Sequence, residues 1–220
     1  MDSFAARLAK LAEAGRTGAL HIPGELGGVF YFRDGDVIYA ESARTPGPAD
    51  LPGPLGWALA VRESTVDAAL GLISGSPLPA TSRFRGAESP WDGEAAGITV
   101  DTLLAEVARR HRVCVQLSAT LTADTAVIPN PHLGPRGVRV SALQWAVLIR
   151  VGDGATPRSL AFDLQRSVFG TVMEVFRLVS LGLLAVARDP GLPERQAPGP
   201  ASRNDAVSFI RAVSGRSAQR

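Results

Sequence analysis

Residues 29–40 read VFYFRDGDVIYA, two apolar runs of four residues separated by Arg33-Asp34-Gly35-Asp36. Asp-Gly between two apolar runs is typical of a tight β-hairpin, because its central positions need positive φ angles. A third apolar run, residues 19–22, precedes them across a turn that contains Pro23 and Gly24. The three runs together predict a small antiparallel β-meander.

Helical patterns lie on both sides of this meander. Residues 3–14 place apolar side chains on one helical face, and residues 55–61 with 66–73 predict a pair of helices that covers the sheet. Residues 44–56 hold four prolines, which remove backbone donors and fix φ, so we expect a loop there.

One more strand and a longer helix complete the N-terminal half. Residues 82–85 predict the strand. Thr99 is a suitable helix cap, Asp101 suits the positive helix start, and an apolar stripe follows. The predicted helix ends in the cluster Arg109-Arg110-His111-Arg112.

The C-terminal half carries the signals of three helices and a strand. A capping box at Ser141 opens the first helix, and Thr156 followed by proline begins the second. A three-residue turn, residues 165–167, leads to the third helix, and a strand follows at residues 183–186. This order is typical of a winged helix-turn-helix module. Its wing lacks a clear second strand, because the next residues are rich in proline.

We therefore predict an α+β fold, in which a small antiparallel β-meander packed with helices precedes a winged-helix-like α/β domain and a C-terminal helix over residues 205–213. The predicted parts are a regulatory or interaction domain at 1–112, a connecting segment at 113–140, a winged helix-turn-helix-like domain at 141–188, and a linker with a C-terminal helix or tail at 189–220.

Composition narrows the class of protein. The chain has 220 residues, 45% of them hydrophobic and 20% charged, which is typical of globular proteins. A single cysteine, Cys114, excludes an internal disulfide, and no apolar stretch approaches the roughly 20 residues of a membrane span. The first residues lack the pattern of a secretory signal, so we expect a cytoplasmic protein without a membrane partner. Residues 1–100 carry a net charge of −4 and residues 101–220 one of +6, so the C-terminal half is the basic one.

The N-terminal half resembles the PATAN domain. The resemblance covers most of residues 1–112 and rests on Leu8-x-x-Leu11, Arg16-Thr17-Gly18-x-Leu20, the stretch 29–40, and Leu103-Leu104-x-Glu106-x-x-Arg109-Arg110. PATAN domains occur in bacterial signalling proteins and are regarded as interaction or sensor modules, often attached to receiver or helix-turn-helix domains. The resemblance thus implies regulation rather than catalysis.

The sequence contains none of the residue patterns that are typical of an enzyme active site. His21, His111 and His132 lie far apart and not at the spacing of metal ligands, while Cys114 lies in an apolar run. No nucleophile elbow, phosphate-binding loop or dinucleotide glycine motif is present. We expect no catalytic residues, no metal and no cofactor.

Arginines around the three C-terminal helices could neutralise DNA phosphates. Arg158 and Arg166 lie where helix-turn-helix modules contact the DNA backbone. The predicted DNA-binding set is Arg136, Arg139, Arg158, Arg166, Ser167, Thr171, Arg177 and Arg188. The third helix also points Phe169, Thr171 and Met173 outward in this interpretation. Phe169 and Met173 form a candidate interface with Phe209 and Ile210.

Three functional hypotheses follow. The first is a bacterial transcriptional regulator that binds double-stranded DNA as a homodimer, with the PATAN-like domain as its sensor or interaction module. The second is a non-enzymatic signalling adaptor whose winged helix binds protein partners. The third adds a cyclic dinucleotide as input to the regulator, bound by Arg109, Arg110 and Arg112. The alternative for these cations is that they complement the helix dipole and stay in solvent.

Overall fold

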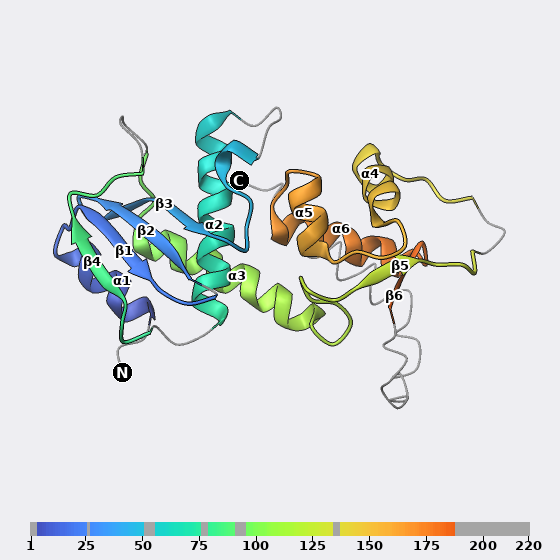
Figure 1. Ribbon diagram of the computed structural model, residues 1–220, viewed down its shortest axis with the longest axis horizontal. Coiled ribbons are helices and arrows are strands. Elements are labelled where there is room, and N and C mark those ends of the chain that lie inside the picture. The colour runs from blue at the N-terminus through green and yellow to red at the C-terminus, as the bar shows by residue number, and fades with distance from the viewer. Residues whose placement is uncertain are drawn as a thin grey trace.

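The computed structural model describes residues 4–25, 27–50, 56–75, 79–90, 96–133 and 137–187. Figure 1 shows two groups of elements side by side, with α3 reaching from one to the other. The first group comprises α1 (Phe4–Glu13), β1 (Gly18–Ile22), β2 (Gly28–Arg33), β3 (Asp36–Ser42), the short 3₁₀ helix η1 (Pro48–Asp50), α2 (Trp57–Gly75), β4 (Arg83–Gly86) and α3 (Val100–Leu117). The second comprises β5 (Val127–Pro129), α4 (Ala142–Val151), α5 (Pro157–Asp163), α6 (Val168–Ser180) and β6 (Leu184–Val186).

The predicted meander is confirmed as part of an antiparallel sheet with the strand order β3-β2-β1-β4. The hairpin turn has φ angles of 51° at Asp34 and 88° at Gly35, as the Asp-Gly pair predicts. Gly35 also lies against α1, because a Cβ atom there would come within 2.5 Å of the Ala12 carbonyl oxygen. The strand predicted at residues 82–85 is confirmed as β4.

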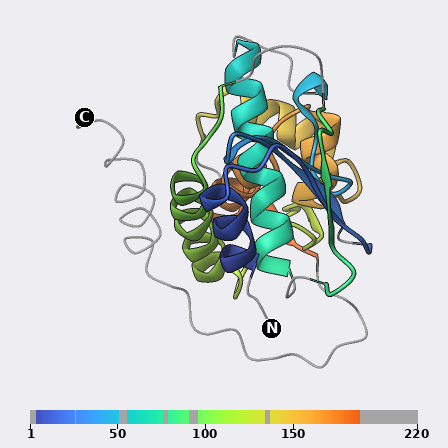
Figure 2. The same cartoon turned by 90° about the vertical axis from the view of Figure 1, so that its left-hand side faces the viewer.

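Helices α1, α2 and α3 pack on one face of this sheet (Figure 2). Their shared core includes side chains with almost no exposed surface, namely Leu8, Leu20, Phe30, Phe32 and Leu103. The chain is therefore α+β, as predicted.

The predicted pair of helices after the proline-rich loop is a single helix, α2, of 19 residues. No glycine or proline separates the two apolar segments, so the helix continues through residues 62–65. Ser64 and Thr65 are buried there, and both hydroxyls donate to the Val61 carbonyl oxygen, at 3.1 Å and 2.7 Å. These bonds satisfy the two hydroxyl groups inside the helix.

The helix predicted to end at residues 109–112 runs on to Leu117. Its N-terminal part belongs to the first core through Leu103 and Val107, and its C-terminal part to a second core through Val113 and Leu117. The boundary drawn at residue 112 thus falls inside a helix. The segment 113–140 is also more than a connection, because it contributes side chains to the second core and strand β5 to the second sheet.

The three C-terminal helices form where the sequence predicts them. Ser141 and Thr156 each make a complete capping box, and Pro157 occupies the first turn of α5. Strand β6 follows α6, but it pairs antiparallel with β5 from upstream in the chain. Ala155, between α4 and α5, bridges to Val127 of the same strand.

Some predicted features lie outside the described residues. These are Arg136, Arg188, the C-terminal helix, Phe209 and Ile210. Within the residues that are described, no helix combines the length and apolarity needed to cross a bilayer.

Candidate functional site

A buried carboxylate joins the two halves. Asp67 of α2 is 4% exposed, and its Oδ2 accepts a 2.5 Å hydrogen bond from the backbone N–H of Val168, the first residue of α6. The backbone of Phe169 also donates to this carboxylate. Free N–H groups and the helix dipole favour an anion at a helix N-terminus. Asp67 therefore fixes the start of α6 against the N-terminal half.

Arg110 of α3 lies beside this contact and is 7% exposed. Its Nη1 and Nη2 donate to the two carboxylate oxygens of Glu63 at 2.8 Å and 2.9 Å. Nη1 also reaches Asp67 at 3.1 Å, and Nε reaches Glu106 at 2.9 Å. The Phe169 ring centroid lies 5.0 Å from the guanidinium carbon. One cation thus holds three carboxylates and an aromatic ring at the seam between α2, α3 and α6.

This environment changes the titration of the carboxyl groups. Burial raises the pKa of Asp67 to about 6, although the Arg110 charge and the backbone hydrogen bonds act in the opposite direction. Hydrogen bonds from Arg109 and Arg110 lower the pKa of Glu106 to about 2 despite its partial burial. The surroundings therefore disfavour the charged form of Asp67 and favour the charged form of Glu106.

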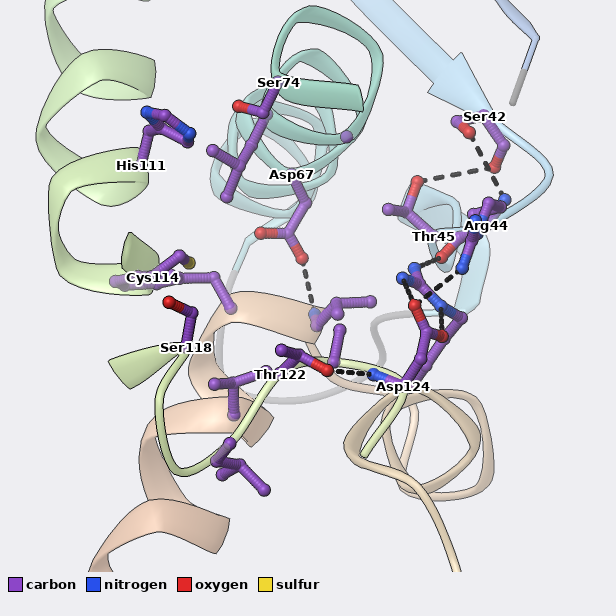
Figure 3. Close-up of a pocket in the computed structure, with 18 of the residues that line it drawn as sticks. Ser42, Arg44, Thr45, Asp67, Ser74, His111, Cys114, Ser118, Thr122 and Asp124 are labelled. Atoms are coloured by element: carbon purple, nitrogen blue, oxygen red, sulfur yellow. Dashed lines mark hydrogen bonds and ion pairs between the residues drawn. The ribbon is translucent and has the colours of Figure 1, made fainter. Parts of the chain in front are cut away.

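A cavity of about 420 Å³ adjoins the seam (Figure 3). Its walls come from both halves: the end of β3, α2, α3, the loop after α3, and the starts of α5 and α6. In Figure 3, His111, Cys114 and Ser118 line the α3 side, while Ser74 and Asp67 come from α2. The apolar lining residues are Leu70, Val115, Leu121, Ala123, Val168, Phe169 and Val172.

Two arginines and one aspartate line another side of this cavity. Asp124 accepts from Arg158 Nε and Nη2 at 2.7 Å and 2.9 Å and from Arg44 Nη2 at 2.8 Å. Arg158 Nη1 donates to the Arg44 carbonyl oxygen at 2.8 Å. The hydrogen bond from Arg158 lowers the pKa of Asp124. This cluster ties α5 to the end of β3 and carries one net positive charge.

The predicted DNA-binding residues that the structure describes do not form one open basic face. Arg158 is bound to Asp124 as described, and Arg177 is paired with Glu174 on its own helix. Ser167 caps α6, accepting from the Gly170 N–H at 2.9 Å. Arg139 and Arg166 are exposed and form no ion pair with any residue that the structure describes.

The expectation that Thr171 and Met173 point outward from α6 is wrong. Both are buried, because α4, α5 and β6 pack around this helix. Phe169 is half-buried against Arg110 of the same chain, so its apolar face is already covered in part.

The three arginines predicted to bind a phosphate-rich ligand have different environments. Arg109 is exposed and pairs with Glu106, donating from Nε and Nη2 at 2.7 Å each, while Arg112 is exposed. Arg110 is committed to carboxylates, so it cannot bind a ligand phosphate in this conformation. The alternative expectation, that the cluster stays in solvent at a helix end, is also wrong for Arg110, because the helix continues and buries it.

The α4 helix presents an exposed apolar pair that the sequence interpretation missed. Trp145 and Ile149 are one turn apart and each is 58% exposed. On α5, Phe162 is 40% exposed and precedes Asp163, whose carbonyl oxygen accepts from Arg150 of α4 at 2.9 Å. The two exposed side chains on α4, Trp145 and Ile149, are called the α4 face below.

The spacing of the buried residues along α3 could have revealed that Arg110 belongs to the seam. Arg110 lies three residues after Val107 and three before Val113, on the same stripe that buries Leu103 and Leu117. A cation inside an apolar stripe predicts buried acidic partners, but nothing local identifies Glu63 or Asp67.

The chain matches no known protein family, no curated protein and no solved structure in comparisons with each.

Proposed function

We propose that this chain is a non-enzymatic bacterial signalling adaptor that binds a protein partner through the α4 face. The observation that carries the proposal is the placement of α6. The helix that would read DNA in a helix-turn-helix module is packed inside its own half, and its start is fixed by Asp67 of the other half.

DNA phosphates would meet unfavourable charge at the start of α6. Phosphate binding needs cations or free N–H groups at the contacting helix end. Here the Val168 N–H is already bonded to Asp67, and Glu63 adds a second carboxylate nearby. The most exposed stripe of α6 offers Glu174 and the arginine paired with it.

The α4 face has the composition of a protein-binding surface. Tryptophan is enriched among the residues that dominate binding energy, and exposed apolar clusters mark interaction sites. The helix that carries Trp145 and Ile149 is fixed in place, because it begins at a complete capping box and packs through the buried Val147 and Val151.

The test replaces Trp145 with the photo-crosslinking residue p-benzoylphenylalanine in cells of a bacterial host that carries the natural gene. We expect one discrete protein adduct, which the additional substitution Ile149→Glu abolishes. The matched control carries the crosslinker at Gln116, which is exposed on α3, and forms no such adduct. An adduct with twice the mass of the chain would instead identify a second copy as the occupant, as the homodimer prediction requires.

DNA binding is the second candidate, favoured by the helix-turn-helix order and by the exposed Arg166 and Arg139, which pair with none of the described carboxylates. It requires the start of α6 to leave Asp67. Fluorescence anisotropy with mixed duplex fragments at two salt concentrations separates the candidates. The adaptor predicts no salt-dependent binding, while steep salt dependence that Arg158→Ala/Arg166→Ala removes would establish the regulator and overturn the adaptor.

A further inference from the structure

The cavity at the seam contains a glycine that local geometry does not require. Gly71 lies in the interior of α2, where glycine is among the poorest helix formers. Its φ is not positive, and a Cβ built on it would meet no atom within 4 Å. No turn or close contact therefore explains the glycine. Gly71 is exposed to solvent and lines the cavity, so a larger side chain there would reduce the space.

The cavity has an apolar region and a charged region. One region is apolar, formed by Leu70, Leu121 and Val172 among others, with the half-buried Cys114 beside them. The other holds Arg44, Arg158 and Asp124, with one net positive charge. Within the described residues the Arg44 guanidinium donates only from Nη2, so it keeps donors for a further acceptor.

We propose that this cavity binds a small soluble amphiphile with a carboxylate head and an unbranched apolar chain. The head lies at Arg44 and the chain extends past Gly71 toward Leu121 and Cys114. The volume of about 420 Å³ falls within the range of small-molecule sites. The proposal does not depend on the adaptor function, because the cavity is separate from the α4 face.

Calorimetric titration of the full-length chain with free monocarboxylates, from butyrate to dodecanoate below its micelle concentration, tests the proposal. We expect saturable binding whose affinity rises by up to about fourfold for each added methylene until the apolar region is full. Dodecanol, which has the chain without the charge, binds at least tenfold more weakly. Equal affinity for the acid and the alcohol, or no saturable heat with any acid, would overturn the proposal.

Matched variants locate the site. Gly71→Phe places a benzyl group in the path proposed for the ligand chain and abolishes binding, whereas Gly71→Ala leaves most of the space and retains it. A Cβ at this position meets open space in the folded chain, so Gly71→Ala is expected to fold, and the circular dichroism spectrum of Gly71→Phe is compared with that of the wild type before its binding is measured. Arg44→Ala weakens dodecanoate tenfold or more and leaves dodecanol unchanged, while Arg112→Ala, at an exposed position on α3, changes neither. Unchanged dodecanoate affinity in Gly71→Phe would place the ligand elsewhere and refute the assignment.

Cys114 supplies a second readout, because it lines the cavity and is the single cysteine of the chain. Its alkylation by iodoacetamide, followed by mass spectrometry, measures access to the cavity. Saturating dodecanoate is expected to slow the reaction at least fivefold in the wild type and to have no further effect in Gly71→Phe. Alkylation that is equally fast with and without dodecanoate would contradict the proposed placement of the chain.

Discussion

Replacing Asp67 with asparagine should change how stability depends on pH. Burial raises the pKa of Asp67 from 3.8 to about 6. The folded state therefore holds this proton more tightly than the unfolded state, and the wild type loses stability as pH rises between those two values. A difference of roughly 2 pH units corresponds to a loss of about 3 kcal/mol.

The asparagine variant keeps the shape of the side chain and an oxygen that can accept from the Val168 N–H, but it does not titrate. We therefore compare the free energies of unfolding of the two proteins. The wild-type value minus the Asp67→Asn value is expected to fall by about 2 kcal/mol from about pH 4 to about pH 7, and by about 3 kcal/mol over the whole titration. Guanidinium denaturation at a series of pH values measures it, and the subtraction removes titrations that both proteins share.

The opposite trend would refute this reasoning. If the difference stays constant or rises with pH, Arg110 and the start of α6 stabilise the carboxylate more than burial disfavours it. An NMR titration of the Asp67 carboxyl carbon provides an independent value of the same pKa. Asp67→Ala removes the hydrogen-bond acceptor as well, and we expect it to be less stable than Asp67→Asn by roughly 1–3 kcal/mol at every pH tested.

Three further changes have defined outcomes. Arg110→Met leaves three carboxylates without their shared cation and should lower the unfolding free energy by roughly 3–5 kcal/mol, whereas Arg109→Ala, at an exposed pair, should cost less than about 1 kcal/mol. Chemical denaturation compares them, and equal costs would contradict the buried network. Gly35→Ala forces a side chain at a φ of 88° against the Ala12 carbonyl. Calorimetry should therefore show a melting temperature lowered by several degrees, and an unchanged melting temperature would refute the contact. Ser141→Ala removes the cap of α4 at a cost of about 1 kcal/mol in the same denaturation assay, and a neutral result would show that the cap is dispensable.

Local signals in the sequence predicted the elements that local chemistry determines. The Asp34-Gly35 turn and the caps at Ser141 and Thr156 each depend on residues adjacent in the chain. These signals were sufficient to predict the meander, the three C-terminal helices and the α+β class.

The candidate site depends on contacts that no local pattern contains. Asp67 and Val168 are 101 residues apart, and Arg110 is 47 residues from Glu63. The outward direction assigned to Thr171 and Met173 was wrong because α6 is covered on several sides, which a single helical stripe does not reveal. The cavity likewise needs both halves before it exists.

The way α3 serves two cores has a consequence for cooperativity. Cutting the chain at residue 112 would divide this helix, and Val113 and Leu117 of the second core would no longer be continuous with the turns that pack Leu103 and Val107 into the first core. The two halves therefore share helix α3 and are not joined by a hinge. Unfolding of either core removes packing contacts from the other. We expect the intact chain to melt in one transition. A change that loosens the packing of one half is transmitted along α3 to the other half.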